Sequence, residues 1–189
     1  MTTIDWNNIK RPAASANTAP KLPAGAYICK IVDAQISEND IGIKIKFNID
    51  IAKGEFAGHF QDYFDKKGEW NFNAVFTRYM IKEDVIDVYT KPFDDFLKIL
   101  ETCNPTYEHI PGNNTNQYKN LYCGFTFGEE EYKDKFGAIR TAVRVKFPCS
   151  IKAIREGKAK PPEPKKYHED IQEKLTNMPD IPDEDLPFL

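Results

Sequence analysis

Positively charged side chains alternate with apolar ones in two segments of this 189-residue chain, residues 41–51 and 139–147. The face between the apolar positions carries Lys44, Lys46 and Asn48 in the first segment, together with Gly42 and Asp50, and Arg140, Arg144 and Lys146 in the second, together with Ala142. A strand with such a pattern shows a charged face, and the five bases Lys44, Lys46, Arg140, Arg144 and Lys146 would attract phosphate groups. Taken singly, each base is also compatible with the ordinary solvated face of an amphipathic strand.

Three aromatic residues could supply flat surfaces on which nucleobases stack. Tyr132 and Phe136 lie in residues 129–136, which we expect to form the hairpin loop between the last two strands. Tyr122 is expected on the exposed side of its strand. For each ring the alternative is a structural position in the core. Together with the bases, these rings predict a surface for single-stranded nucleic acid.

Residue patterns typical of catalysis are sparse. The three histidines have no serine or cysteine partner motif, and no glycine-rich phosphate loop is present. Glu129, Glu130, Glu131 and Asp134 could be considered as a nuclease metal cluster, but consecutive carboxylates at a hairpin tip do not converge on one ion. The four cysteines have no CxxC spacing and predict free thiols rather than a zinc site. We therefore expect a protein that is not an enzyme and needs no cofactor.

The net charge of −3 is unevenly distributed along the chain. From residue 177 to the end there are four acids and no base, so the rest of the chain carries 26 bases against 25 acids. A nearly neutral body can bind nucleic acid only through a local group of bases. The two alternating segments are the candidates for that group.

One helix and five strands are expected to position these side chains. Thr90 can cap a helix, Pro92 suits its first turn, and the chain should leave the helix near Asn104. Its apolar stripe has helical spacing and consists of Phe93, Phe96, Leu97 and Leu100.

Period-two alternation predicts strands at residues 25–36, 41–51, 58–64, 121–128 and 139–147. Residues 70–81 form an insertion that is either helix or strand. In the last strand the side chains expected to point inward are Ile139, Thr141, Val143, Val145 and Phe147. Three strands, a helix and two strands is the order of the OB-fold, a five-stranded Greek-key barrel, so we predict a mainly β protein of that class with one helix between strands 3 and 4.

The predicted domain organisation has three parts. Residues 1–21 form a flexible arm, residues 22–156 the OB-fold domain, and residues 157–189 a disordered linker with an acidic tip. No apolar run approaches the length of a membrane span, and the first residues lack the pattern of a signal peptide. We therefore expect a cytoplasmic protein without a membrane partner. The sequence leaves open whether the protein forms a homo-oligomer.

The C-terminal tip places apolar side chains behind a run of acids. Its residues are Asp183, Glu184, Asp185, Leu186, Pro187, Phe188 and a final Leu189. So few apolar groups cannot offset the entropy of ordering the segment, which leaves Leu186 and Phe188 free to enter a pocket on another protein. The alternative is an acidic terminus that only aids solubility.

The tip resembles the C-terminal tip of bacterial and phage single-stranded DNA-binding proteins, where acids precede a small apolar group and Pro-Phe. This chain departs from that pattern because Leu189 follows the phenylalanine. Within the body, residues 22–27 (LPAGAY), 54–58 (GEFAG) and 154–157 (IREG) are similar to a single-stranded DNA-binding family from phages of Gram-positive hosts. The resemblance implies an OB-fold that holds single-stranded DNA, and a tip that recruits replication or recombination proteins in the host cytoplasm.

We therefore expect a non-enzymatic, phage-type protein that binds single-stranded DNA without sequence preference. The competing interpretation is an OB-like adaptor or inhibitor that binds proteins through its tip and does not bind DNA.

Overall fold

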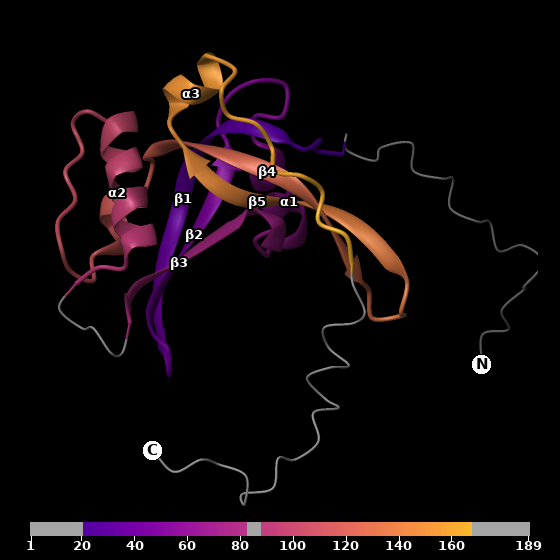
Figure 1. The fold of residues 1–189 in the computed structure, drawn as a ribbon, viewed down its shortest axis with the longest axis horizontal. Coiled ribbons are helices and arrows are strands. Elements are labelled where there is room, and N and C mark those ends of the chain that lie inside the picture. Colours follow the sequence, from indigo (N-terminus) through magenta and orange to yellow (C-terminus); the bar gives the residue numbers. More distant parts are fainter. Residues whose placement is uncertain (1–20, 83–87, 168–189) are drawn as a thin grey trace, which may run out of the picture.

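The computed structural model describes residues 21–82 and 88–167 (Figure 1). This part of the chain is mainly β and contains one five-stranded sheet with the strand order β3-β2-β1-β4-β5. Each pair of neighbouring strands is antiparallel. The bounds of the strands are β1 (Gly25–Asn39), β2 (Gly42–Ile51), β3 (Val75–Lys82), β4 (Tyr122–Lys133) and β5 (Ile139–Cys149).

The alternation in residues 41–51 is confirmed as strand β2. Ile45, Phe47 and Ile49 are fully buried, and the residues between them point to the opposite face. Asp50 is a departure from the pattern because its carboxylate is buried. Ile41 is a second departure, since it lies in the β1–β2 turn before the strand begins and is 56% exposed.

The predicted helix is confirmed as α2 (Lys91–Cys103), with Thr90 at the N-cap position and Pro92 in the first turn. All four residues of its apolar stripe are buried. The hydroxyl of Thr90 donates to the carbonyl oxygen of Tyr79 instead of accepting from its own helix. The cap residue therefore ties α2 to β3.

The prediction of a strand at residues 58–64 was wrong, because this segment is the start of helix α1 (His59–Lys67). The Asp50 carboxylate accepts hydrogen bonds from the backbone N–H groups of Phe60 and Gln61, which have no partner inside the helix. Left-handed glycines bound the helix at both ends, Gly58 with φ 81° and Gly68 with φ 74°. The third strand is β3, which follows the 3-10 turn η2 (Phe72–Ala74) within the segment whose type the sequence left open.

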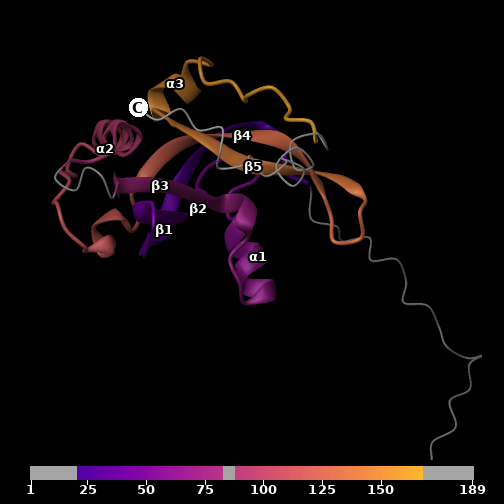
Figure 2. The same cartoon turned by 60° about the horizontal axis from the view of Figure 1, so that its bottom comes forward.

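The last hairpin is longer than its sequence pattern predicts. β4 continues to Lys133 and the turn is confined to residues 134–138, so Tyr132 lies in a strand and not in a loop. The inward orientation expected for Ile139, Thr141 and Phe147 was also wrong, since all three are exposed. Ile139 and Thr141 pair with Lys133 and Glu131, beyond the part of β4 that pairs with β1. There the hairpin extends past the rest of the sheet (Figures 1 and 2). At Phe147 a β-bulge shifts the register, so that Phe147 pairs with Thr126 and Val145 pairs with Phe127.

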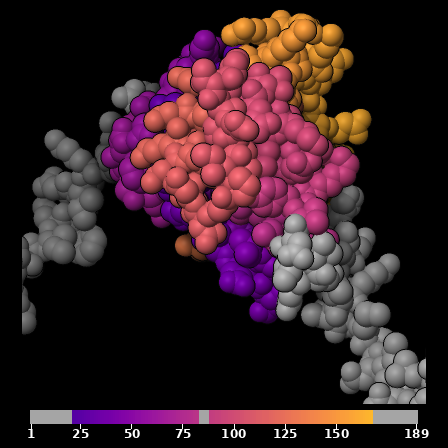
Figure 3. Space-filling model, turned by 90° about the vertical axis from the view of Figure 1, so that its left-hand side faces the viewer, coloured from indigo at the N-terminus to yellow at the C-terminus, as the bar shows by residue number. Residues whose placement is uncertain are grey.

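The core lies between the sheet and the helices at its ends. Phe96 of α2 packs edge-on against Phe47, with ring centroids 5.1 Å apart. Phe60 of α1 stacks on Phe127, with centroids 5.8 Å apart. Figure 2 shows α1 on the opposite side of the sheet from α3 (Ile151–Arg155). In Figure 3, α2 and the chain that follows it cover one end of the molecule.

Residues 158–167 lie on the sheet, although the sequence assigns them to a linker. The backbone N–H of Glu131 donates to the carbonyl oxygen of Lys165, and the N–H of Lys165 donates to that of Glu129. Gly128 is needed at this contact, because a Cβ there would lie 2.7 Å from Pro162 Cγ. The segment after α3 therefore follows β4 along the hairpin (Figure 1).

Within residues 21–82 and 88–167, no helix is both long enough and apolar enough to span a membrane.

Candidate nucleic-acid interface

The outer face of β2 carries three of the predicted site residues in a row. We call this the β2–β3 surface; it consists of Lys44, Lys46, Asn48 and their β3 partners Tyr79, Thr77 and Val75. On the other side of β2 the three residues pair with Ser37, Gln35 and Asp33 of β1. Within the described part of the chain, neither lysine forms a salt bridge with an acid. Both ammonium groups are therefore available to a phosphate.

The bases of β5 gather around an acid instead. Lys146 donates a hydrogen bond to the Glu130 carboxylate, Arg144 Nη1 lies 3.7 Å from it, and Lys165 Nζ lies 3.9 Å from it. The hydrogen bond from Lys146 holds the pKa of Glu130 below its usual value, so this carboxylate is ionised at neutral pH. We call these residues the β4–β5 surface, together with Tyr132 and Phe72. Three bases against one acid leave it positively charged.

Arg140 is paired separately, with Asp134 of the hairpin turn. Asp134 also accepts backbone hydrogen bonds from Phe136 and Ala138, so its main contact is with its own turn. Among the described residues, no group of three His, Cys, Asp or Glu side chains is placed to hold a metal ion. The acids of the hairpin bind bases and backbone N–H groups.

The predicted bases do not form one stripe. β2 and β5 are not neighbours in the sheet, because β1 and β4 lie between them. The structure therefore places Lys44, Lys46 and Asn48 on one surface and Arg144 and Lys146 on another.

The three predicted aromatic residues occupy three different places. Tyr132 is half-buried in β4, opposite Arg140 and with its ring centroid 5.3 Å from Arg144 Cζ. Phe136 is at the hairpin tip and is 80% exposed. Tyr122 stands at the other end of β4, where both its backbone groups bond the Asn104 side chain. Ten residues of strand separate Tyr122 from Tyr132, about 33 Å if the strand were straight, so one nucleotide cannot reach both.

Phe72 belongs to the β4–β5 surface and was not among the predicted site residues. It is 71% exposed, and Arg144 Cζ lies 5.3 Å from its ring centroid. The same guanidinium thus touches the rings of Phe72 and Tyr132, which are 60 residues apart in the chain. The sequence does carry one signal, an alternation of aromatic residues and asparagines in residues 70–73 (WNFN) that no core strand requires.

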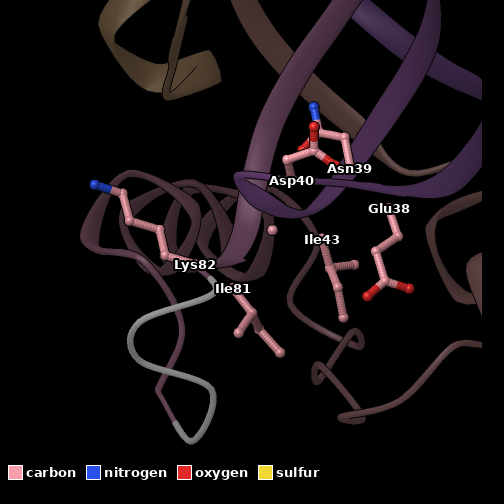
Figure 4. Close-up of a pocket in the computed structure, with 7 residues that line it drawn as sticks. Glu38, Asn39, Asp40, Ile43, Ile81 and Lys82 are labelled. Atoms are coloured by element: carbon pink, nitrogen blue, oxygen red, sulfur yellow. The ribbon is translucent and has the colours of Figure 1, made fainter.

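A pocket of about 460 Å³ lies at the β1–β2 turn and the end of β3 (Figure 4). Ile43 and Ile81 are paired in the sheet and line it, and Glu38 is the β1 partner of Ile43. The other charged residues that line the pocket are Asp40 and Lys82. Two acids against one base do not favour a phosphate, so we leave this pocket outside the interface.

The predicted partner-binding residues, Asp183, Glu184, Asp185, Leu186, Pro187 and Phe188, lie outside the described residues. A comparison with protein-family models and with curated proteins finds no match to this chain.

Proposed function

We propose that this protein binds single-stranded DNA without marked sequence preference. The observation that carries the proposal is the β2–β3 surface, where Lys44 and Lys46 stand side by side on one strand face without an acid partner among the described residues. Phosphates of a single strand need such positive charge and carry no requirement for a particular base.

The strand order supports the further proposal that the sheet belongs to an OB barrel. Three successive strands lie side by side, and the fourth returns to the free edge of the first, as in a Greek key. Closing such a barrel would join β3 to β5, and both β3 and η2 contact β5. In an OB barrel the face of strands 2 and 3 is the ligand face, which is where Lys44 and Lys46 are placed.

The aromatic residues support a single-stranded rather than a double-stranded ligand. Phe72 and Phe136 offer exposed ring faces, and Tyr132 lies beside Arg144. Bases stack on such rings only when they are free of a duplex. We further propose that the acidic tip recruits replication or recombination proteins, and that the protein acts in the host cytoplasm if it is phage-encoded.

Titration of labelled oligo-dT at several salt concentrations tests DNA binding. Affinity should fall with salt, and Lys46→Ala should make the slope of log K against log salt shallower by about 0.7. The matched control is Lys91→Ala, because Lys91 is an exposed lysine of α2 paired with Asp95. Its slope should equal that of the unchanged protein.

Absence of binding to oligo-dT at low salt would overturn the proposal. It would favour the adaptor interpretation, in which the chain contacts only proteins. Equal slopes for all three proteins would remove the β2–β3 surface from the binding site.

A further inference from the structure

A second pocket, of about 360 Å³, lies between α1, η2 and the β4–β5 hairpin. Its volume falls at the lower end of the ~300–1,000 Å³ typical of small-ligand sites. We call it the Phe72 pocket, because its lining residues Asn71 and Asn73 stand on either side of Phe72; the Phe72 ring does not line it but contacts Arg144, which also contacts the lining residue Tyr132. The other lining residues are Lys21, Leu22, His59, Phe60, Tyr132, Thr141, Ala142 and Val143.

The lining of the Phe72 pocket separates into an apolar part and a polar part. Leu22, Phe60 and Val143 are buried, and they belong to the core of the domain. The residues with greater exposure are mostly polar, including both asparagines. Small-ligand sites are usually built in this way, with an apolar floor and a few polar groups around it.

The polar groups of the pocket are mostly neutral and have hydrogen-bonding capacity to spare. Asn71 Oδ1 accepts from the backbone N–H of Asn73, which leaves the Asn71 amide NH₂ free to donate. The Asn73 amide makes no hydrogen bond to any residue in the described ranges. Burial lowers the pKa of His59, so its imidazole is neutral at pH 7 and offers one donor and one acceptor. Neutral donors and acceptors suit the edge of a nucleobase better than a phosphate.

The ring of Phe72 offers a flat surface next to Asn71 and Asn73 in the chain. The ring of Phe72 is held in place by the 3-10 turn and by the guanidinium of Arg144, yet most of it faces solvent. Removing apolar surface from water is favourable, and Phe72 gains this stabilisation only when another group packs on its ring. Arg144 Nε is buried and has no hydrogen-bond partner among the described residues. The site thus combines an exposed ring, a fixed cation and unused polar groups.

We propose that the Phe72 pocket takes one unpaired nucleobase of a bound single strand, with the base stacked on Phe72 and its edge at Asn73 and His59. This inference rests on the proposed function and adds to it a site where a base, rather than the backbone, is recognised. Lys21 lines the pocket and Arg144 contacts the ring of its lining residue Tyr132, so we expect these two bases to meet the neighbouring phosphates.

The test compares two probes, oligo-dT and an abasic oligonucleotide of equal length, for the full-length protein and for Phe72→Ala. The abasic strand has the same phosphates and no base to stack. Phe72→Ala should weaken oligo-dT binding roughly 5- to 150-fold, the range measured for single stacked bases. Its affinity for the abasic strand should not change. Asn73→Ala should weaken oligo-dT binding about 5-fold through the lost hydrogen bond, again without an effect on the abasic strand.

Phe147→Ala is the matched control. Phe147 is a phenylalanine of β5 that is 57% exposed, but unlike Phe72 it is not next in sequence to a lining residue and has no contact with the Arg144 guanidinium among the described residues. It should leave both affinities unchanged. Thermal melting of each variant verifies the fold, which Phe72 should scarcely affect because its ring is largely in solvent.

Two outcomes overturn different statements. If the unchanged protein binds neither strand, the proposed DNA binding fails and the pocket inference with it. If the unchanged protein binds oligo-dT but Phe72→Ala weakens both strands equally, or neither, DNA binding stands and the pocket inference is wrong.

Discussion

At the scale of single residues, Glu130 affects the charge that the β4–β5 surface can offer. It accepts from Lys146 and lies within salt-bridge distance of Arg144 and Lys165. A phosphate that approaches these bases must compete with the carboxylate, which is already in place and largely shielded from solvent.

Replacing Glu130 by glutamine should therefore strengthen DNA binding. The substitution keeps the size of the side chain and removes its charge, which frees bases for phosphate. One additional phosphate contact would make the slope of log K against log salt steeper by about 0.7. Oligo-dT titrations at several salt concentrations measure the slope, and a melting curve accounts for the lost ion pairs. An unchanged slope would show that the three bases do not face the DNA.

Cys103 is a second residue with an unusual environment. A hydrogen bond from the Cys123 thiol, with further backbone hydrogen bonds from Ile151 and Gly124, lowers the pKa of Cys103 to about 6 despite its partial burial. The thiolate is the reactive form of cysteine, so the proportion that can react rises as the pH passes through this pKa.

Alkylation by iodoacetamide should accordingly reach half its maximal rate near pH 6 at Cys103. Burial raises the pKa of Cys149 to about 11, so that thiol should react slowly at neutral pH. Mass spectrometry of the alkylated peptides measures both rates, and Cys103→Ser identifies the reactive site. A midpoint near 9 for Cys103 would contradict the hydrogen-bonded arrangement.

At the scale of secondary-structure elements, α1 depends on an acid from a neighbouring strand. The Asp50 carboxylate accepts from the backbone N–H groups of Phe60, at 2.9 Å, and Gln61, at 3.4 Å. Gly58 at the N-cap position has no side chain, so the carboxylate of Asp50 in β2 caps the helix in its place. The contact also keeps Phe60 against the core and next to the Phe72 pocket.

Asp50→Ala should lower the free energy of unfolding by about 1–2 kcal/mol, as the loss of a helix cap does. Asp65→Ala in the same helix is the control, because Asp65 is exposed and bonds only Gln61 among the described residues. Its effect should stay within about 0.5 kcal/mol. Denaturant unfolding of the three proteins measures the difference. Equal stabilities would mean that packing of Phe60 alone holds the helix.

At the scale of the whole molecule, the acids and bases of the chain are segregated. Four acids and no base occupy residues 177–189, while bases dominate both proposed binding surfaces. A tethered acidic segment competes with phosphates at a high effective concentration. The tip should therefore influence DNA binding at both proposed surfaces.

Deleting residues 183–189 should abolish recruitment of replication or recombination proteins and leave thermal stability unchanged. Oligo-dT affinity should stay the same or rise, most clearly at low salt. The control is a full-length chain with Leu186→Ala and Phe188→Ala, which keeps every acid. It should lose recruitment without any change in DNA affinity. Pull-downs and titrations measure the two properties; equal recovery of partners by all three chains would rule out the tip.

The sequence alone determined the elements whose pattern is local. β2 follows from alternation at every second residue, and α2 follows from a cap, a proline and a stripe at helical spacing. These signals suffice because each arises within a few residues of chain. The same reasoning placed Lys44, Lys46 and Asn48 on the face of β2 opposite its buried residues, where the structure also has them, with Lys46 exposed and the other two partly buried.

Only the tertiary structure decided features that depend on residues far apart in the chain. Helix α1 is capped by an acid from another element, so its own residues do not reveal where the helix begins. Glu130 pairs with Arg144 and Lys146 from across the hairpin, and the rings of Phe72 and Tyr132 meet one guanidinium only because folding brings them together. Periodicity describes which face of an element a side chain occupies, but not which other element will lie against that face. Helix caps between elements, ion pairs and pockets depend on which elements lie against each other, and tertiary packing decides that.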